Sequence, residues 1–234
     1  MTTVTDQVKE KLRAVLVFDQ NMLILAAILG FFAGFASTFF RWMIEFFESI
    51  FSIKGLSLTG IPPQFYPFLL PLMPMLGGCF IGLICKYFPN AVKENGVHKV
   101  MHAVAMDDGK LRKRTITSCA ITSSITIGSG GSAGREGPTV QIGSAIGSTI
   151  GQILHLSTER IRVLVGCGAA AGIAASFNAP LAGVLFALEI ILGDFTIHTF
   201  SPIIIASVIG TVTGRALEGN EVTFNVPVHE LVHP

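Results

Sequence analysis

Charged side chains are scarce in this sequence. Asp, Glu, Lys and Arg make up 13% of the 234 residues and nearly cancel, with a formal net charge of +1, whereas typical soluble domains carry about 25% charged residues. Half of the residues are apolar and the mean hydropathy is +0.64. This composition is typical of a chain that crosses a membrane several times, with lipids as its first partners. The balanced charge, without a basic stripe, argues against a nucleic-acid partner.

Paired cysteines and metal-type histidine spacings are also missing. The four cysteines lie singly in apolar segments, which predicts buried packing residues: Cys79, Cys85, Cys119 and Cys167. Four of the histidines show no spacing that would suit a metal ion: His98, His102, His155 and His198. We therefore expect no metal and no other cofactor.

The N-terminus lacks the features of a cleavable signal peptide, because it carries acidic and basic residues where an apolar core would stand. Val4, Val8, Leu12 and Val15 recur at helical spacing. Residues 1–18 are thus predicted to form an amphipathic helix on the membrane surface.

The rest of the chain is a series of apolar segments of unequal length. Those beyond residue 160 are about 13–18 residues long, whereas a full crossing needs about 20. Residues 90–109 are too polar to cross and resemble a re-entrant piece. The segments are 22–53, 65–88 (interrupted by Pro71 and Pro74), 115–158 (split at 134–138), 163–177, 180–192 and 199–216. Short helices broken by Gly and Pro are typical of irregular backbone that lines a cavity. The predicted fold class is an all-α, polytopic integral membrane protein with tilted, short and re-entrant helices.

Small residues recur at intervals of four in two of these segments. Gly143, Gly147 and Gly151 form one such series, and Gly168 and Gly172 another. Such series let helix backbones approach closely, so we expect them to lie at helix contacts.

The candidate site lies in the segment 115–158, whose only formal charges are Arg135 and Glu136. An ionisable group at membrane depth costs at least about 2.5 kcal/mol, so it is a functional candidate. Pro138 predicts a helix that begins nearby, because proline is favoured in the first turn. Glu136 would then lie just ahead of a positive helix end that favours its carboxylate or a free anion. Competition between the two would form a gate that opens when Glu136 is protonated.

Asn178 and Pro180 predict a second helix start of the same kind, with Asn178 as the N-cap. Two half-helices could then direct their N-termini at one place. Arg135 could pair with Glu136, extend to the membrane interface or cap a helix.

Two other classes of function stay open at this point. One is an intramembrane serine protease with Ser132 as nucleophile and His198 as base, although Ala133 stands where such enzymes have glycine. The other is a purely structural membrane subunit, in which Glu136 would have no role.

Two long motifs resemble the chloride channel/antiporter (CLC) family. They are GSGGSAGREGP at 128–138, followed by TVQIG, and GIAASFNAPLAGVLFALE at 172–189. The resemblance implies an all-helical homodimer in the cell (inner) membrane in which each subunit has its own pathway for chloride or a similar small anion. Family subunits consist of two inverted halves, and this chain resembles the first: residues 19–222 would be the first half of the membrane domain and 223–234 a link towards a missing second half.

By position, Glu136 matches the family's gating glutamate. Gly134, Arg135, Gly137 and Pro138 match the loop whose backbone amides approach the anion. The family's Gly-Ser-Gly-Ile-Pro segment has its best counterpart at 94–98, so the predicted anion-binding residues include Asn95, Gly96 and Val97, with Asn95 in place of the serine.

A further departure concerns proton coupling. Glu189 matches the first of two consecutive glutamates found in many family antiporters, and Ile190 stands at the second, the internal proton acceptor. Both a channel and a proton-coupled antiporter remain open.

Overall fold

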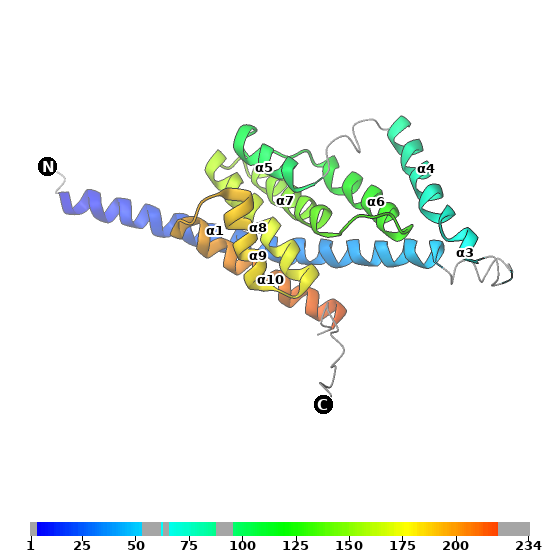
Figure 1. Cartoon of the computed structure of the whole chain (residues 1–234). Coiled ribbons are helices and arrows are strands. Elements are labelled where there is room, and N and C mark those ends of the chain that lie inside the picture. The colour runs from blue at the N-terminus through cyan, green and yellow to red at the C-terminus, as the bar shows by residue number, and fades with distance from the viewer. Residues whose placement is uncertain (1–3, 53–61, 63–65, 88–95, 220–234) are drawn as a thin grey trace, which may run out of the picture.

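The structure is a computed structural model that describes residues 4–52, 62, 66–87 and 96–219, with burial given from residue 20 onward except at Pro67. Every regular element in these residues is helical (Figure 1). The α-helices are α1 (Val4–Phe51), α3 (Tyr66–Leu69), α4 (Leu72–Tyr87), α5 (Val97–Met106), α6 (Arg114–Gly128), α7 (Glu136–Ile153), α8 (Thr158–Phe177), α9 (Pro180–Phe186) and α10 (Ile197–Glu218), and a π-helix, η2 (Ala187–Leu192), follows α9. The predicted all-α class is confirmed.

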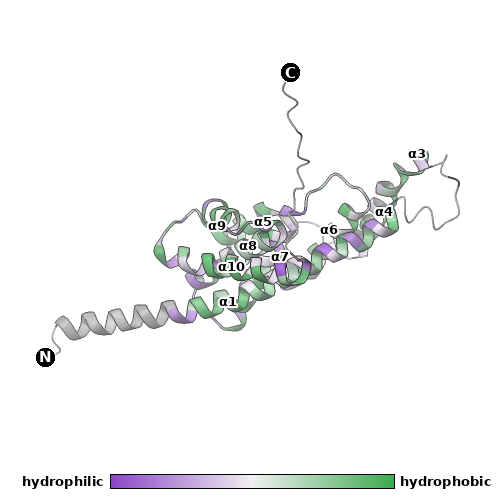
Figure 2. Ribbon diagram, turned by 90° about the horizontal axis from the view of Figure 1, so that it is seen from below, coloured by the Kyte–Doolittle hydropathy of each residue, from purple (hydrophilic) through white to green (hydrophobic). Residues whose placement is uncertain are grey.

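Within the residues that the structure describes, three helical stretches are long and apolar enough to cross a membrane: Gln20–Phe51, Thr158–Phe177 and Ile197–Glu218. Figure 2 colours the ribbon by hydropathy and shows the apolar residues along the helices in green. Helix α5 is too short for this, since its ten residues extend for about 15 Å at 1.5 Å per residue. The mixture of long and short membrane helices agrees with the predicted polytopic architecture.

The long helix α1 runs past the other helices without interruption (Figure 1). The surface helix predicted for residues 1–18 is therefore continuous with the first span, and its division from that span remains a prediction. The predicted link at 223–234 lies outside the described residues.

Helix α8 lies at the centre of the molecule and packs against α1, α7, α9 and α10. Its contact with α7 is made by the predicted glycines. A Cβ atom on Gly143 would lie 2.1 Å from the carbonyl oxygen of Gly168, and one on Gly168 would lie 2.0 Å from that of Gly143. Gly147 meets the carbonyl oxygen of Leu164 in the same way, at 2.1 Å. The two backbones therefore touch, as expected from the spacing of the small residues.

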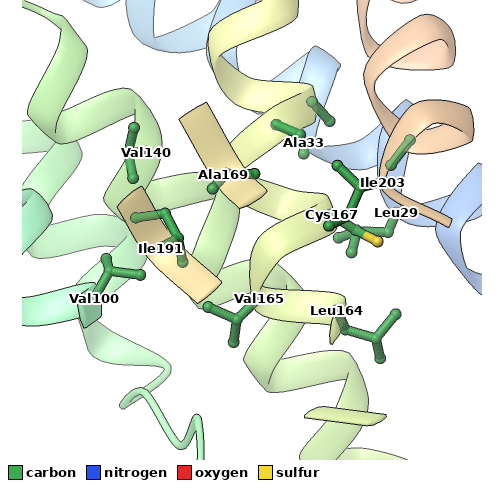
Figure 3. Close-up of a cluster of buried hydrophobic side chains, with 14 of the residues drawn as sticks. Leu29, Ala33, Val100, Val140, Leu164, Val165, Cys167, Ala169, Ile191 and Ile203 are labelled. Carbon is green, nitrogen blue, oxygen red and sulfur yellow. The ribbon is translucent and has the colours of Figure 1, made fainter. Parts of the chain in front are cut away.

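A second close contact joins α1 to α10. A Cβ on Gly30 would lie 2.6 Å from the carbonyl oxygen of Ala206, and one on Gly34 would lie 2.9 Å from that of Gly210. Leu29 and Ile203 fill the space between these helices and α8, as Figure 3 shows. Small residues thus build a rigid block of α1, α7, α8 and α10.

The cysteine prediction is half right. Cys119 and Cys167 are buried, whereas Cys85 is half-buried and Cys79 is exposed. Both of the latter lie on α4, which packs mainly against α6 and α3. Neighbouring side chains such as Phe80 and Leu83 are exposed as well, so α4 presents an apolar surface suited to lipid.

Candidate functional site: the paired starts of α5 and α7

The helical structure is interrupted between α6 and α7, at the place predicted from Gly134 and Pro138. Helix α6 ends at Gly128, and the N–H of Gly131 donates to the carbonyl oxygen of Thr126 at 2.8 Å as the chain turns away. Helix α7 then begins at Glu136, two residues before Pro138. Glu136 thus lies in the first turn of α7 rather than just ahead of it.

The Glu136 side chain is exposed and lies over the backbone of Gly134. A Cβ atom at Gly134 would lie 1.9 Å from Oε2 of Glu136. The absence of a side chain at Gly134 therefore leaves room for the carboxylate beside the helix start. In the first turn the carboxylate is stabilised by the positive end of α7.

Arg135 turns in another direction. Its guanidinium carbon lies 4.9 Å from the centre of the Phe177 ring at the end of α8. This cation–π contact fixes the residue before Glu136 to the central helix. Arg135 thus has a structural contact, and its predicted part in anion binding remains a prediction.

The start of α5 lies against the start of α7. Gly96 precedes α5 with φ of 118°, a backbone conformation that favours glycine. Its N–H donates to Oε1 of Gln141 on α7 at 2.8 Å. A Cβ on Gly137 would lie 3.7 Å from the Cα of Gly96. Two helix N-termini therefore meet at Gly96 and Gly137.

The first turns of both helices carry backbone N–H groups that have no partner within their own helix. In α5 these include Val97 and His98, and in α7 Gly137, whereas Pro138 has no N–H to offer. The positive ends of the two helix dipoles add at the place where the starts meet. This arrangement can accept one negative charge, either the Glu136 carboxylate or a free anion.

Most of the predicted site residues come together here: Gly96, Val97, Gly134, Gly137, Pro138 and Glu136. Asn95 lies outside the described residues. The N–H of Gly96 donates to Gln141. On α5, the backbone N–H groups of Val97 and His98 are therefore the candidate donors to an anion. The anion-binding and gating roles of these residues remain predictions.

The prediction for Asn178 is wrong. Asn178 ends α8 in the left-handed conformation, with φ of 54°, and Ala179 takes the position before α9. The Oδ1 atom of Asn178 accepts a hydrogen bond from Nε of Arg215 at 2.5 Å. An asparagine side chain tolerates this conformation, which suits it to a helix end. The helix start that the structure places beside α7 is that of α5.

Glu189 and Ile190 lie in η2, which follows α9 in the chain. Both line a cleft of about 1190 Å³. Ile190 is half exposed in the wall of this cleft and offers no titratable group. The departure noted at this position therefore lies in the wall of this cleft.

Sequence reasoning missed Gln141. Its side chain is fully buried and accepts hydrogen bonds from two other segments of the chain. The signal was an amide among the apolar and small residues in the first half of α7, since a buried polar side chain needs partners.

Short helices whose positive ends meet inside a membrane protein are the arrangement that membrane transport proteins use to bind ions. Comparison with known proteins identifies the family within this class. Residues 77–234 match the family model described as "Voltage gated chloride channel". The chain belongs to this family, the CLC family.

Among curated relatives, a ClcB-like protein of Ralstonia nicotianae is 36% identical over 165 residues, which are 69% of this chain and 38% of that protein. The H(+)/Cl(-) exchange transporter ClcA of Vibrio parahaemolyticus is 30% identical over 217 residues, which are 90% of this chain and 45% of that protein. The chain thus spans less than half the length of these relatives.

Solved structures agree. A CLC-type fluoride/proton antiporter superposes with a TM-score of 0.70 at 25% identity, over 99% of this chain and 53% of that one. A slow cyanobacterial Cl-/H+ antiporter gives 0.70 at 26% identity, over 86% of this chain and 48% of that one. These relatives are channels and exchange transporters, so the prediction that the chain is not an enzyme is confirmed and the protease alternative is excluded. The chain is a part of an integral membrane protein.

Proposed function

We propose that the protein containing this chain transports chloride or a similar small anion across the membrane, and that Glu136 is its protonatable gate. The observation that carries this proposal is the position of Glu136 in the first turn of α7, where that turn meets the start of α5. When charged, the carboxylate occupies the positive place; when protonated, it leaves that place to the anion.

The exchange mechanism is part of the proposal. Curated relatives include both a channel of the ClcB type and a proton exchanger of the ClcA type. Ile190 cannot carry a proton, so we expect proton movement to be weak or to follow a different route. Tight stoichiometric proton transport that needs no carboxylate other than Glu136 would contradict this expectation.

We place the protein in the cell (inner) membrane. We expect it to be a homodimer in which each subunit contains a second half that completes the pathway. The chain covers about half of each relative, which supports the proposal that a second half completes the pathway. Large apolar side chains on α9 and α10 are exposed, and lipid, the second half or a partner subunit would cover them: Leu181, Leu185, Val208 and Val212.

The test is anion flux from liposomes that contain the complete protein, measured against pH. Flux of the natural protein should rise as the pH falls, because protonation removes the charge of Glu136. Glu136→Gln and Glu136→Ala should both transport at a rate with little pH dependence. Glu45→Gln is the matched control, since Glu45 is an exposed carboxylate that pairs with Arg41 on α1.

Unchanged rate and pH dependence in both Glu136 variants would refute the gate. The other charged or titratable side chains at the paired starts, among the described residues, are His98 and Lys99 in the first turn of α5 and Arg135 before α7.

A further inference from the structure

Gln141 is a fully buried amide on α7, five residues after Glu136. Its Oε1 atom accepts the N–H of Gly96 at 2.8 Å and the S–H of Cys119 at 3.3 Å. One oxygen atom thus connects α7 to the residue before α5 and to the middle of α6. A buried hydrogen bond of this kind is costly to lose, because its donor is then left without a partner.

The hydrogen bond to Gly96 fixes where α5 begins relative to α7. Gly96 is the N-cap residue of α5, and its left-handed φ gives the chain its turn into that helix. The neighbouring approach, between Gly137 and Gly96, is an ordinary van der Waals distance and has no direction. The Gln141 oxygen therefore supplies a directional contact between the paired starts.

Building on the proposed function, we propose that Gln141 is a positioning residue that sets the anion selectivity. It does not touch the anion in this account. It holds the amides of Val97 and His98 at a fixed distance from the first turn of α7, and it removes the Gly96 N–H from the donors that face the anion. Selectivity among halides depends on how closely fixed donors can replace the water around ions of different radius.

The experiment uses Gln141→Met, which keeps the approximate length and volume of the side chain but removes the amide group and with it the Oε1 acceptor. Fluxes of fluoride, chloride and bromide are compared in liposomes that contain the complete protein. The ratio between these anions should change by about threefold to tenfold, the range expected for one lost buried hydrogen bond. The pH dependence that Glu136 confers should persist.

Gln152→Met is the matched control. Gln152 lies on the same helix, and its Nε2 donates to the carbonyl oxygen of Leu111 at 2.9 Å and to Oγ of Ser148 at 2.9 Å, at the far end of α7 from the paired starts. It also ties a loop to α7, so a general loss of stability would affect both variants alike. Selectivity in Gln152→Met should equal that of the natural protein.

Equal selectivity in Gln141→Met and Gln152→Met would overturn the proposal. If Gln141→Met does not fold, Gly96→Ala tests the same contact from the other side, because alanine disfavours the φ of Gly96. It should shift the anion ratio, and an unchanged ratio would overturn the proposal equally. Failure of the proposed function is distinguished by the Glu136 variants, which would then leave the pH dependence unchanged.

Discussion

The side of α7 that packs against α8 and the N-terminal end of α7 differ sharply. Along its length, Gly143 and Gly147 contact the backbone of α8 with no room for a methyl group. At its start, the Glu136 side chain is exposed and the first-turn amides face the start of α5. The comparison shows how one helix can be immobile and still present a site, because tight packing on one side fixes the position of the open end.

The largest effect should come from the packed face. Gly168→Ala places a methyl group 2.0 Å from the carbonyl oxygen of Gly143, which belongs to the backbone and cannot move alone. The two helices must separate, at a cost near or above the upper end of the about 1–3 kcal/mol typical of overpacking. Thermal unfolding and the yield of folded protein in detergent measure this.

Gly78→Ala serves as the control, since a Cβ at Gly78 has no neighbour within 4 Å. Equal melting temperatures for the two variants would show that α7 and α8 are not in backbone contact.

A smaller effect, on transport rather than folding, should come from the N-terminal end of α7, where Glu136 lies. Gly134→Ala places a methyl group where Oε2 of Glu136 lies, and the flexible carboxylate can move aside. Loss of its favourable position at the helix start, worth about 0.3–1 kcal/mol, should raise flux at neutral pH about two- to fivefold. The melting temperature should fall far less than in Gly168→Ala.

The effect of Gly134→Ala should vanish when Glu136 is already replaced by alanine. A change of flux that persists in the double variant would mean that Gly134 acts independently of the carboxylate.

The smallest effect should come from the contact that joins the two regions. Phe177→Leu removes the ring beneath Arg135, and the cation–π contact is worth about 0.5–1 kcal/mol at partly exposed sites. The melting temperature should fall slightly, and Phe177→Trp should restore it because indole binds cations best. A lower melting temperature for the Trp variant than for the Leu variant would contradict this role of the ring.

Much of this architecture follows from local sequence. Pro138 and the surrounding glycines mark the break before α7, and glycines four residues apart mark the α7–α8 contact, because both depend on neighbours within one segment. Which helix starts meet depends on packing between distant segments. The helix-start signals suggested α9 as the partner of α7, the family resemblance suggested residues 95–97, and the structure shows the start of α5.

Asn178 shows the same limit. Its side chain suits both an N-cap and a left-handed helix end, and the contact with Arg215 of α10 accompanies the second. The exposure of Cys79 also depended on packing, since an apolar helix can face lipid as readily as protein.

The central claim is that the Glu136 carboxylate and the transported anion compete for one place between the starts of α5 and α7. Anomalous diffraction from crystals of the complete protein soaked in bromide tests it directly, with the natural protein and Glu136→Gln compared at the same pH. We predict a bromide ion beside the first-turn backbone N–H groups of α5 and α7, at Val97, His98 and Gly137, with an occupancy that is clearly higher in the variant. Bromide absent from this place in both proteins, or bound equally in both, would contradict the account.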